Sequence, residues 1–465
     1  MSRRHVPAVL ALVAGALVAV PAQAAHAATV QVPCSVPDLV KAINTANGTP
    51  RADTIRLARG CTYKLRAPDP VNPGNGLPVI TSEITIDGRG ATIERDGQGG
   101  EVPRFRIIYV DKTGVLKLIR TTIRGGYATD CPAFPDAVGA SCGGGISNNG
   151  KMRITHSKFT GNTSASPVFA QGGGIDSPGS AKSTISDTEV SGNHVVYTGQ
   201  EPESGAAGGG ISNDGPLTIT DSKLSGNTAT VTPDTRSTAF GAGIISFFGT
   251  TIKNTVISGN RAFAEKGTAR AAVSNGIPAD SGRLTVIGGA VRDNVSDAPG
   301  GVAQGGGIAN NALMTVKGVK ISGNRAVAKD GIARGGGVRV GPSGTLDLKE
   351  SRITGNTVEA PGGTAQGAGI DNPDGGVLRA ERNEILRNTA TAENGTAQGG
   401  GLYHAAGLPA SGTSTLKRNT ITDNRAADGG GIFRASGGLT LNGDVVRENR
   451  PNNCAPTGTV PGCTG

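Results

Sequence analysis

The sequence is poor in aromatic side chains and in histidine. Its 465 residues include no Trp, 5 Tyr, 9 Phe and 5 His. A hydrophobic core must therefore be built from aliphatic residues. Sugar subsites in carbohydrate-degrading enzymes usually stack rings on aromatic side chains, which offer a large apolar face. The shortage of such side chains weighs against an enzyme of that kind.

Long hydrophobic runs are missing after the first 27 residues. The chain begins with Arg3 and Arg4, an apolar run over 8–20, and two Ala-x-Ala sequences that end at Ala24 and Ala27. This order is typical of a secretory signal peptide, and we expect cleavage after Ala27. The run is too short for an ordinary membrane-spanning helix. We therefore expect a secreted, extracellular protein with no transmembrane anchor, exported by either the Sec or the twin-arginine route.

Strong charge of one sign is missing as well. The formal net charge is +9, and Arg3 and Arg4 of the leader carry two of these positive charges. The remaining excess is mild for this length and does not form basic clusters. This distribution argues against a nucleic-acid partner and fits weak attraction to acidic polymers.

Glycine, in contrast, is abundant, with 75 residues beside 26 Pro. Collagen is excluded because Gly does not occupy every third position. A helical bundle is disfavoured because each interior Gly costs about 1 kcal/mol relative to Ala. The glycines recur in register, which is typical of a repeat architecture and not of a disordered chain.

The strongest pattern is an internal repeat of about 32 residues. A tetrad similar to Gly-x-Gly-Ile recurs, and its last residues are Ile146, Ile175, Ile211, Ile244, Ile277, Ile308, Val338, Ile370, Leu402 and Ile432. One Asn lies between consecutive tetrads, usually in Ser/Thr-Gly-Asn: Asn162, Asn193, Asn227, Asn260, Asn294, Asn324, Asn356, Asn388, Asn424 and Asn449. The third residue before each Asn is large and apolar in every repeat, and the eighth in all but one.

The spacing of the apolar residues predicts short strands. The tenth residue before the Asn is also apolar in most repeats, for example at Leu217, Leu284 and Leu346. Positions ten and eight before the Asn have the period of a β-strand. A second strand is expected three residues before the Asn and a third at the tetrad. This predicts an all-β fold, a single-stranded right-handed parallel β-helix of about 12 coils with three short strands per coil. A propeller blade needs four longer strands over about 40–45 residues and is not supported.

The Asn marks a corner of each coil. Asn tolerates the left-handed backbone conformation, and its amide can bond to the equivalent Asn one coil away. The stretch between each Asn and the next tetrad varies in length, as in 194–207 and 228–240, so surface loops are expected there. Near the N-terminus, Leu39, Val40 and Ile43 lie on one side of a helical pattern. A helix there would cap the apolar column.

These patterns divide the chain into four parts: a signal peptide over 1–27, an N-terminal cap with irregular first coils over 28–125, β-helix repeats over 126–450, and a disulfide-closed tail over 451–465.

Six cysteines in an exported chain favour disulfides. They fall into three local groups, and pairing within each group closes the shortest loops: Cys34 with Cys61, Cys131 with Cys142, and Cys454 with Cys463. A metal site is not supported, because the sequence contains no Cys-x-x-Cys and no His near a Cys pair. No cofactor or metal is predicted, and we expect a monomer.

In its repeats and its cysteine-flanked N-terminal segment, the chain resembles secreted β-helix repeat proteins of the pectate-lyase-like superfamily. The start Cys34-Ser35 and the following helical segment resemble an N-terminal module named for its Cys-Ser-Leu-Arg-Glu-Ala sequence, although the Arg-Glu-Ala part is absent. The alternation of Gly-Gly-Gly-Ile with Phe159-Thr160-Gly161-Asn162 is similar to the repeats of polymorphic outer membrane proteins. The resemblance implies the fold but no single activity, because this fold is shared by lyases, hydrolases and adhesins.

The resemblance makes catalysis a question to test. Enzymes on such scaffolds need clustered carboxylates on adjacent coils, with a Lys or Arg base in the lyases. Asp176 and Asp371 both follow a tetrad, but about six coils separate them. The three histidines of the mature chain, His156, His194 and His404, share no register, and we expect ordinary surface residues. The catalytic residues, if any exist, are not identified by the sequence.

One outward face is the candidate binding surface. Lys317 and Lys349 occupy one register on adjacent coils, and Lys320 and Arg352 occupy another. Like charges one strand spacing apart repel unless a polyanion or an acid relieves them. The alternative to a binding surface is an ordinary solvated face with surface ion pairs. An outward Thr column over 184–315 is a further candidate, since flat Thr arrays can bind ice, but Thr is also a common strand residue.

We therefore expect a non-catalytic extracellular or surface module that has a structural or binding role, with acidic glycan or cell-envelope material as the partner. The alternative is a polysaccharide-active enzyme on the same scaffold, a lyase sooner than a hydrolase. Three or more acids that converge with a Lys or Arg within three neighbouring coils would favour the enzyme.

Overall fold

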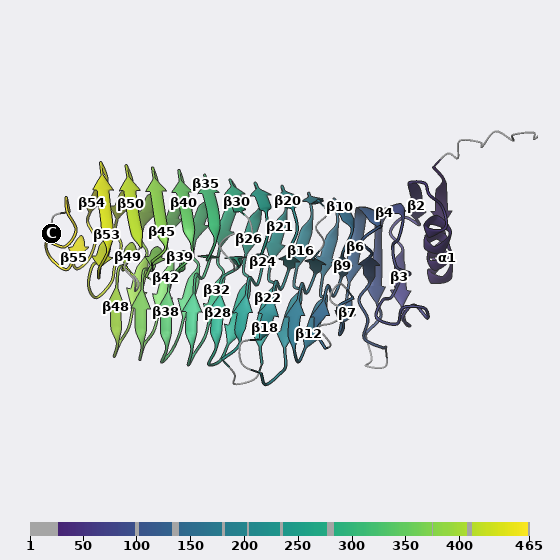
Figure 1. The fold of residues 1–465 in the computed structure, drawn as a ribbon, viewed down its shortest axis with the longest axis horizontal. Coiled ribbons are helices and arrows are strands. Elements are labelled where there is room, and N and C mark those ends of the chain that lie inside the picture. The colour runs from purple at the N-terminus through teal and green to yellow at the C-terminus, as the bar shows by residue number, and fades with distance from the viewer. Residues whose placement is uncertain are drawn as a thin grey trace, which may run out of the picture.

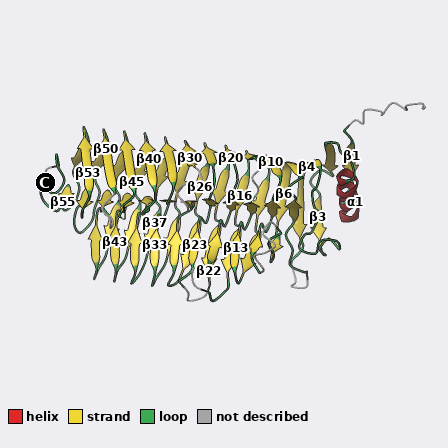
Figure 2. Ribbon diagram, in the orientation of Figure 1, coloured by secondary structure: helices red, strands yellow, loops and turns green. Residues whose placement is uncertain are grey.

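The protein is an elongated parallel β-helix of about 11 turns in a computed structural model. The structure describes residues 27–463, except 98–101, 133–138, 179–181, 202–203, 233–235, 277–282, 374 and 407–411. The predicted signal peptide lies outside these residues, apart from Ala27. One helix covers one end, and strands make up the rest of the regular structure in the described part (Figure 2). Among the described residues, no helix is both long and apolar enough to cross a membrane.

The predicted N-terminal cap is present. Helix α1 (Val36–Asn47) begins after Ser35, whose hydroxyl accepts a hydrogen bond from the backbone N–H of Asp38. This is the usual N-cap arrangement, and it satisfies one of the free N–H groups of the first turn. Leu39 and Ile43 are fully buried against the first coils. The helix thereby closes the open end of the apolar column (Figure 1). Strand β1 (Thr29–Val32) lies next to it (Figure 2).

Each regular coil has five short strands. In the first of them these are β9 (Ile146–Asn148), β10 (Lys151–Thr155), β11 (Lys158–Thr160), β12 (Thr163–Ser166) and β13 (Phe169–Gln171). The first three correspond to the three strands that the sequence predicts. The other two form where surface loops were expected.

The coils stack in parallel and in register. Strands equivalent to β10 and β11 form a 25-stranded sheet, and those equivalent to β9 form a 12-stranded sheet. Strands equivalent to β12 and β13 form two 9-stranded sheets. Ile154 lies beside Ile185 of the next coil, and Phe159 lies beside Val190. The predicted apolar columns are therefore confirmed except at one tetrad. There Val273 lies between Ile244 and Ile308, and the predicted residue Ile277 lies outside the described residues.

The cross-section contains two separate cores. Large aliphatic side chains fill the space between the 25-stranded and 12-stranded sheets. A second core of small residues, mostly Ala with some Val, lies in the two 9-stranded sheets. It is built from alternating residues such as Ala229 and Val231, whose spacing of two points both side chains to one face of their strand. The stretch after each Asn is a second lobe, which explains why loops were the wrong expectation for 194–207 and 228–240.

The Gly-rich tetrad forms the waist between the two lobes. Gly172 has a φ of +54°, which favours glycine. A Cβ atom on Gly173 would lie 2.4 Å from the backbone oxygens of both His194 and Gly209. The backbones on the two sides of the waist are thus in direct contact, and no side chain fits between them.

The Asn corner is a continuous hydrogen-bonded ladder, as predicted. The side-chain amide of Asn193 donates to Oδ1 of Asn227 at 3.0 Å and to the backbone oxygen of Phe159 at 3.0 Å. Its backbone N–H donates to the same Oδ1 at 3.0 Å. The pattern repeats from Asn162 to Asn449, and all these side chains are buried. The ladder satisfies polar groups that would otherwise be costly inside the fold.

A second ladder, absent from the sequence prediction, runs through the turn between the two strands of the 25-stranded sheet. The backbone N–H groups of Thr121, Ser157 and Thr188 donate to the hydroxyls of Ser157, Thr188 and Ser222, each one coil further on. Later coils use Asn383 and Asn419 in the same place. The row was missed because Ser, Thr, Val and Asn alternate in it without a single residue type.

All three predicted disulfides are present. They join Cys34 to Cys61, Cys131 to Cys142, and Cys454 to Cys463. The first ties the cap to the first coil, and the last closes the tail beside strand β55 (Cys454–Ala455). The ends of the solenoid are therefore covalently fixed.

Candidate functional site

A column of left-handed residues precedes the second ladder at each turn. Arg89, Arg120, His156 and Asp187 occupy this column in successive coils, with φ values of 54°, 49°, 51° and 49°. Non-glycine residues rarely adopt this conformation. The residues that follow Arg120, His156 and Asp187 are Thr121, Ser157 and Thr188, which belong to the Ser/Thr ladder. The left-handed side chains are exposed on the outside of the solenoid.

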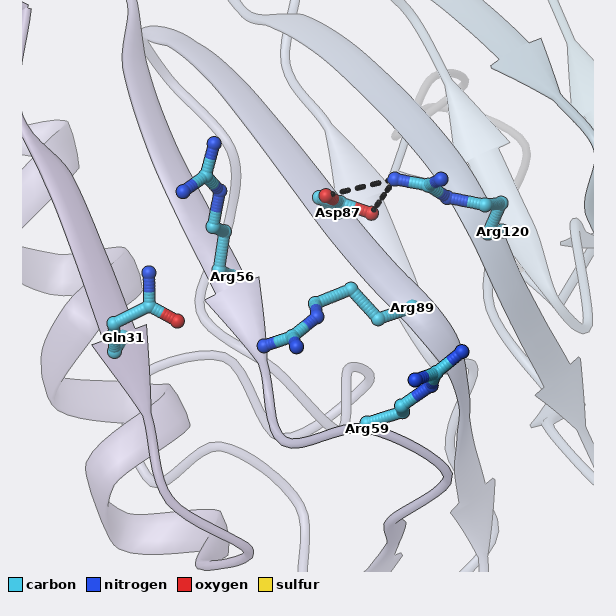
Figure 3. Close-up of a pocket in the computed structure, with 6 residues that line it drawn as sticks. All are labelled: Gln31, Arg56, Arg59, Asp87, Arg89 and Arg120. Atoms are coloured by element: carbon cyan, nitrogen blue, oxygen red, sulfur yellow. Dashed lines mark hydrogen bonds and ion pairs between the residues drawn. The ribbon is translucent and has the colours of Figure 1, made fainter.

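The first coils carry a basic pocket at this column. Strands β1, β2 (Asp53–Leu57) and β4 (Glu83–Arg95) run side by side, so that Gln31 neighbours Arg56 and Arg56 neighbours Asp87. The register of β4 shifts between Asp87 and Ala91 against β6 (Val115–Arg124). Together these elements border an open cavity of about 550 Å³, lined by Gln31, Arg56, Arg59, Asp87, Arg89 and Arg120 (Figure 3).

The pocket has an excess of positive charge. Arg120 donates two hydrogen bonds to Asp87, at 2.9 and 3.0 Å. Arg56, Arg59 and Arg89 form no ion pair with any described residue. The six lining residues therefore have four guanidinium groups and one carboxylate. Guanidinium groups offer paired donors that match carboxylate, sulfate or phosphate oxygens.

The basic pocket continues into a second cavity along the same face. This cavity of about 590 Å³ shares Arg89 and Arg120 with the first and extends over His156 to Asp187 and Glu189. Lys158 and Glu189 form an ion pair of 3.3 Å in its wall. We call the two cavities together the basic groove. The groove crosses several coils, and its charge changes from basic to mixed away from the cap.

The face predicted from the sequence is arranged as expected in register. Lys317 lies beside Lys349, and Lys320 lies beside Arg352. Two of the four charges are partly neutralised, because Lys317 lies 3.5 Å from Glu350 and Arg352 lies 2.9 Å from Glu384. Lys320 and Lys349 have no ion pair within the described part of the chain. Binding at this face stays a prediction.

The histidines differ from expectation in one case. His156 is exposed, at the turn after β10 and not on the strand itself. His194 begins strand β17 (His194–Tyr197), half-buried, with Nδ1 2.9 Å from the hydroxyl of Thr228. Burial lowers the pKa of His194. His404 is fully buried at the end of β49 (Leu402–His404), so the expectation of a surface residue was wrong there. It occupies the inward position that Asn372 fills one coil earlier.

The burial of His404 makes stability depend on pH. Desolvation, followed by the charge of Arg434, lowers the pKa of His404 to about 4. In the unfolded chain the imidazole takes up a proton near pH 6.5. The stabilising effect of the neutral ring is therefore complete above pH 6.5 and is lost as the pH falls toward 4. We expect a loss of about 2–3 kcal/mol over this range, since one pKa unit corresponds to about 1.4 kcal/mol.

Thermal unfolding of wild type and His404→Asn at a series of pH values checks this prediction. Asn is the matched replacement because Asn372 occupies the neighbouring inward position. The stability of the variant relative to wild type should rise as the pH falls from 6.5 to 4. A difference that stays constant with pH would contradict the assigned burial of a neutral ring.

A carboxylate cluster lies at the other end of the same coils, in a cavity of about 450 Å³. Glu94 and Asp96 line it together with Lys64, Arg124 and Tyr127. Asp96 lies 3.0 Å from Arg66, and this hydrogen bond lowers the pKa of Asp96. Glu94 is bound to Arg124. The cluster contains two acids, not three, and both are held in ion pairs.

The other acids considered for catalysis remain apart. Asp176 lies on β14 (Ile175–Ser177) and Asp371 on β44 (Ile370–Asn372), which are separated by five intervening strands of the 12-stranded sheet. Asp371 lies 3.6 Å from Arg339. The two carboxylates cannot act on one substrate bond.

The basic pocket was not found from the sequence. Its arginines belong to the irregular first coils, where the Gly tetrad and the Asn register do not apply. A signal was present nonetheless, because Arg59, Arg89 and Arg120 recur at intervals of about one coil. Aligning the first coils on this recurrence would have placed the three on one face.

The protein is thus a parallel β-helix whose first coils carry a basic groove on the surface. No known family model matches the chain, and no curated protein matches it by sequence. Among solved structures, it is similar to the A-module of the Azotobacter vinelandii mannuronan C-5 epimerase AlgE6, at 15% identity over 90% of this chain and 95% of that chain, with a TM-score of 0.46. It is also similar to a double mutant of the tailspike protein of E. coli bacteriophage HK620 in complex with pentasaccharide, at 11% identity over 88% of this chain and 74% of that chain, with a TM-score of 0.30. These likenesses concern the solenoid architecture alone.

Proposed function

We propose that the protein is an exported, non-catalytic β-helix that binds an acidic polymer, such as an anionic polysaccharide of a cell envelope, in the basic groove. The observation that carries this proposal is the set of three arginines without carboxylate partners around one open cavity. Such a set is self-repulsive, and a bound polyanion relieves the repulsion. Export is supported by the leader sequence and by the three disulfides.

The shape of the groove supports an extended ligand. The two cavities share Arg89 and Arg120, and together they extend from strand β1 to strand β16 (Glu189–Ser191). Adjacent coils are about 4.8 Å apart. A linear polymer that lies along the axis would therefore meet a new side chain of the left-handed column at each coil. A compact small anion would use only the arginine end.

The acids of the groove do not favour a lyase. The groove's described lining residues include Asp87, Asp187 and Glu189, of which Asp87 and Glu189 are in ion pairs. No set of three free acids converges there on one Lys or Arg. The enzyme remains the second candidate, and release of unsaturated uronates from polygalacturonate by the purified protein would establish it in place of the binding function.

Binding of polygalacturonate by the mature chain tests the proposal. Replacing Arg56, Arg59 and Arg89 together by Gln should weaken binding about a hundredfold at low salt, because a hydrogen bond to a charged group contributes roughly 1.5–3 kcal/mol and exposure reduces this value. Wild-type affinity should fall steeply with added salt. Titration calorimetry at two salt concentrations measures both effects, with neutral dextran as the control ligand.

A second variant separates the two candidate surfaces. Replacing Lys317, Lys320, Lys349 and Arg352 by Gln removes the face predicted from the sequence without changing the core. If this variant loses binding and the arginine variant keeps it, the ligand lies on the lysine face and the assignment of the groove is wrong. If neither variant changes the affinity, binding by charged faces is excluded.

A further inference from the structure

A buried acid lies against one of the three disulfides, outside the basic groove. A carboxylate oxygen of Asp176 and the sulfur atoms of Cys131 and Cys142 lie within 4.8 Å of one another. No other three His, Cys, Asp or Glu side chains gather so closely in the part of the chain that the structure describes. The disulfides Cys34–Cys61 and Cys454–Cys463 have no such neighbour there.

Asp176 has no structural partner that explains its burial. Its side chain is fully buried, and neither carboxylate oxygen accepts a hydrogen bond of normal geometry. Ser147 and Ser212 are its register neighbours on the adjacent coils. An unpaired carboxyl in such a place is costly to the fold. Buried acids of this kind are common where proton transfer is needed.

Burial and a neighbouring charge favour the protonated form of Asp176. Burial is the main cause, and the carboxylate of Asp214 adds to it, so the pKa of Asp176 is raised well above its usual range. Ser212 and the Arg106 guanidinium oppose this rise. Burial also raises the pKa of Asp214, to about 6. Burial and Asp214 thus favour a protonated carboxyl beside the two sulfur atoms.

Arg106 fixes the backbone on both sides of the disulfide. Its fully buried guanidinium donates to the carbonyl oxygen of Cys142 at 3.3 Å and to Oδ1 of Asp130 at 2.7 Å. It also donates to the carbonyl oxygen of Asp130, the residue before Cys131. The N–H of Cys142 donates to that same oxygen at 3.1 Å. Both cysteines are thus held in place independently of the S–S bond.

We propose that Cys131–Cys142 is a thiol–disulfide exchange centre in which Asp176 is the proton donor and acceptor. The thiolate of an external dithiol attacks Cys131 Sγ, because Cys131 is 8% exposed whereas Cys142 is fully buried. The S–S bond breaks, its electron pair passes to Cys142 Sγ, and this sulfur takes the proton of Asp176. The second sulfur of the dithiol then attacks its own first sulfur, which releases Cys131 as a thiolate. The dithiol leaves oxidised, and Asp176 regains a proton from solvent.

The three disulfides of one chain allow an internally controlled experiment. The mature protein is treated with dithiothreitol, quenched with an alkylating reagent at intervals, and mapped by mass spectrometry. Cys131–Cys142 should open at least about tenfold faster than the other two disulfides, although Cys34 and Cys463 are more exposed than either of its cysteines. The reason is that general acid catalysis contributes about 10²-fold or more. Its rate per dithiothreitol thiolate should fall as the pH rises and Asp176 loses its proton.

Asp176→Asn isolates the role of the acid. This replacement should slow the opening of Cys131–Cys142 about tenfold or more and remove its pH dependence, while binding of polygalacturonate is unchanged. Asp371→Asn, at the equivalent place after a tetrad, is the matched control and should leave the rate as in wild type. Equal opening rates for all three disulfides, or a rate that Asp176→Asn does not alter, would overturn the proposal. Should Asp176→Asn fail to fold, a flat pH profile in the wild type overturns it equally.

Discussion

Replacing Ile321 by Asp should unfold the central coils. Ile321 is fully buried, between Val291 of the preceding coil and Ile353 of the next. The change removes the burial of an aliphatic side chain, about 2–3 kcal/mol, and leaves a carboxylate with no partner in the core. The combined cost should reach about 5 kcal/mol or more, because an uncompensated buried charge alone costs about 3–5 kcal/mol. Calorimetric or circular-dichroism melting measures the effect.

Ser322→Asp is the control for this change, since Ser322 is the next residue along the strand and its side chain points to the opposite face. It should leave the melting temperature close to that of wild type. A melting temperature of Ile321→Asp within a degree or two of wild type would show that the apolar column is assigned to the wrong register.

Replacing Gly306 by Ala should break the waist between the two lobes. The added Cβ would lie 2.5 Å from the backbone oxygen of Arg325 and 2.6 Å from that of Gly336. Both neighbours are backbone atoms in hydrogen-bonded coils, so no flexible side chain can move aside. We expect a destabilisation of about 3 kcal/mol or more, at the upper end of the cost of overpacking.

Gly300→Ala is the matched substitution. Its Cβ would lie 3.4 Å from a side-chain carbon of Lys266, which is ordinary contact, and the residue is exposed. The two variants should differ in melting temperature and in hydrogen exchange of the coils around 300–340. Equal stability of the two would mean that the lobes can separate at the waist without loss.

Much of the architecture is predictable because one rule operates in every coil. Large apolar residues at fixed distances from an Asn identify inward positions, and Ile154 and Phe159 are buried as this rule requires. The Asn ladder follows from the same regularity, whereas the disulfides follow from the local grouping of the cysteines. The second lobe was hidden because Ala and Thr form it, and their alternation is weak against a background of Gly.

The candidate site was less predictable, for a physical reason. A groove depends on which side chains are exposed at the irregular end of a solenoid, and β4 shifts its register there. The repeat rule identifies buried positions, whereas exposed ones such as Arg56 and Arg89 are free to vary. The lysine face was found because its residues lie in the regular coils, where outward registers can be counted. The buried position of His404 could have been inferred from its register with Asn372.

The column of left-handed residues sets regularly spaced positions along the axis. Most coils contribute one exposed side chain at this turn, whereas Gly288, Gly318 and Gly443 occupy it in three others, and successive positions are about 4.8 Å apart. The residue types at these positions change along the chain, from Arg89 and Arg120 through His156 to Asp187 and Asp221, then later to Arg382 and Arg418. Exchanging residues between these positions would move a charge along the molecule in fixed steps and leave the core of each coil unchanged. The solenoid can therefore be matched to the charge spacing of a polymer by substitutions at one position per coil.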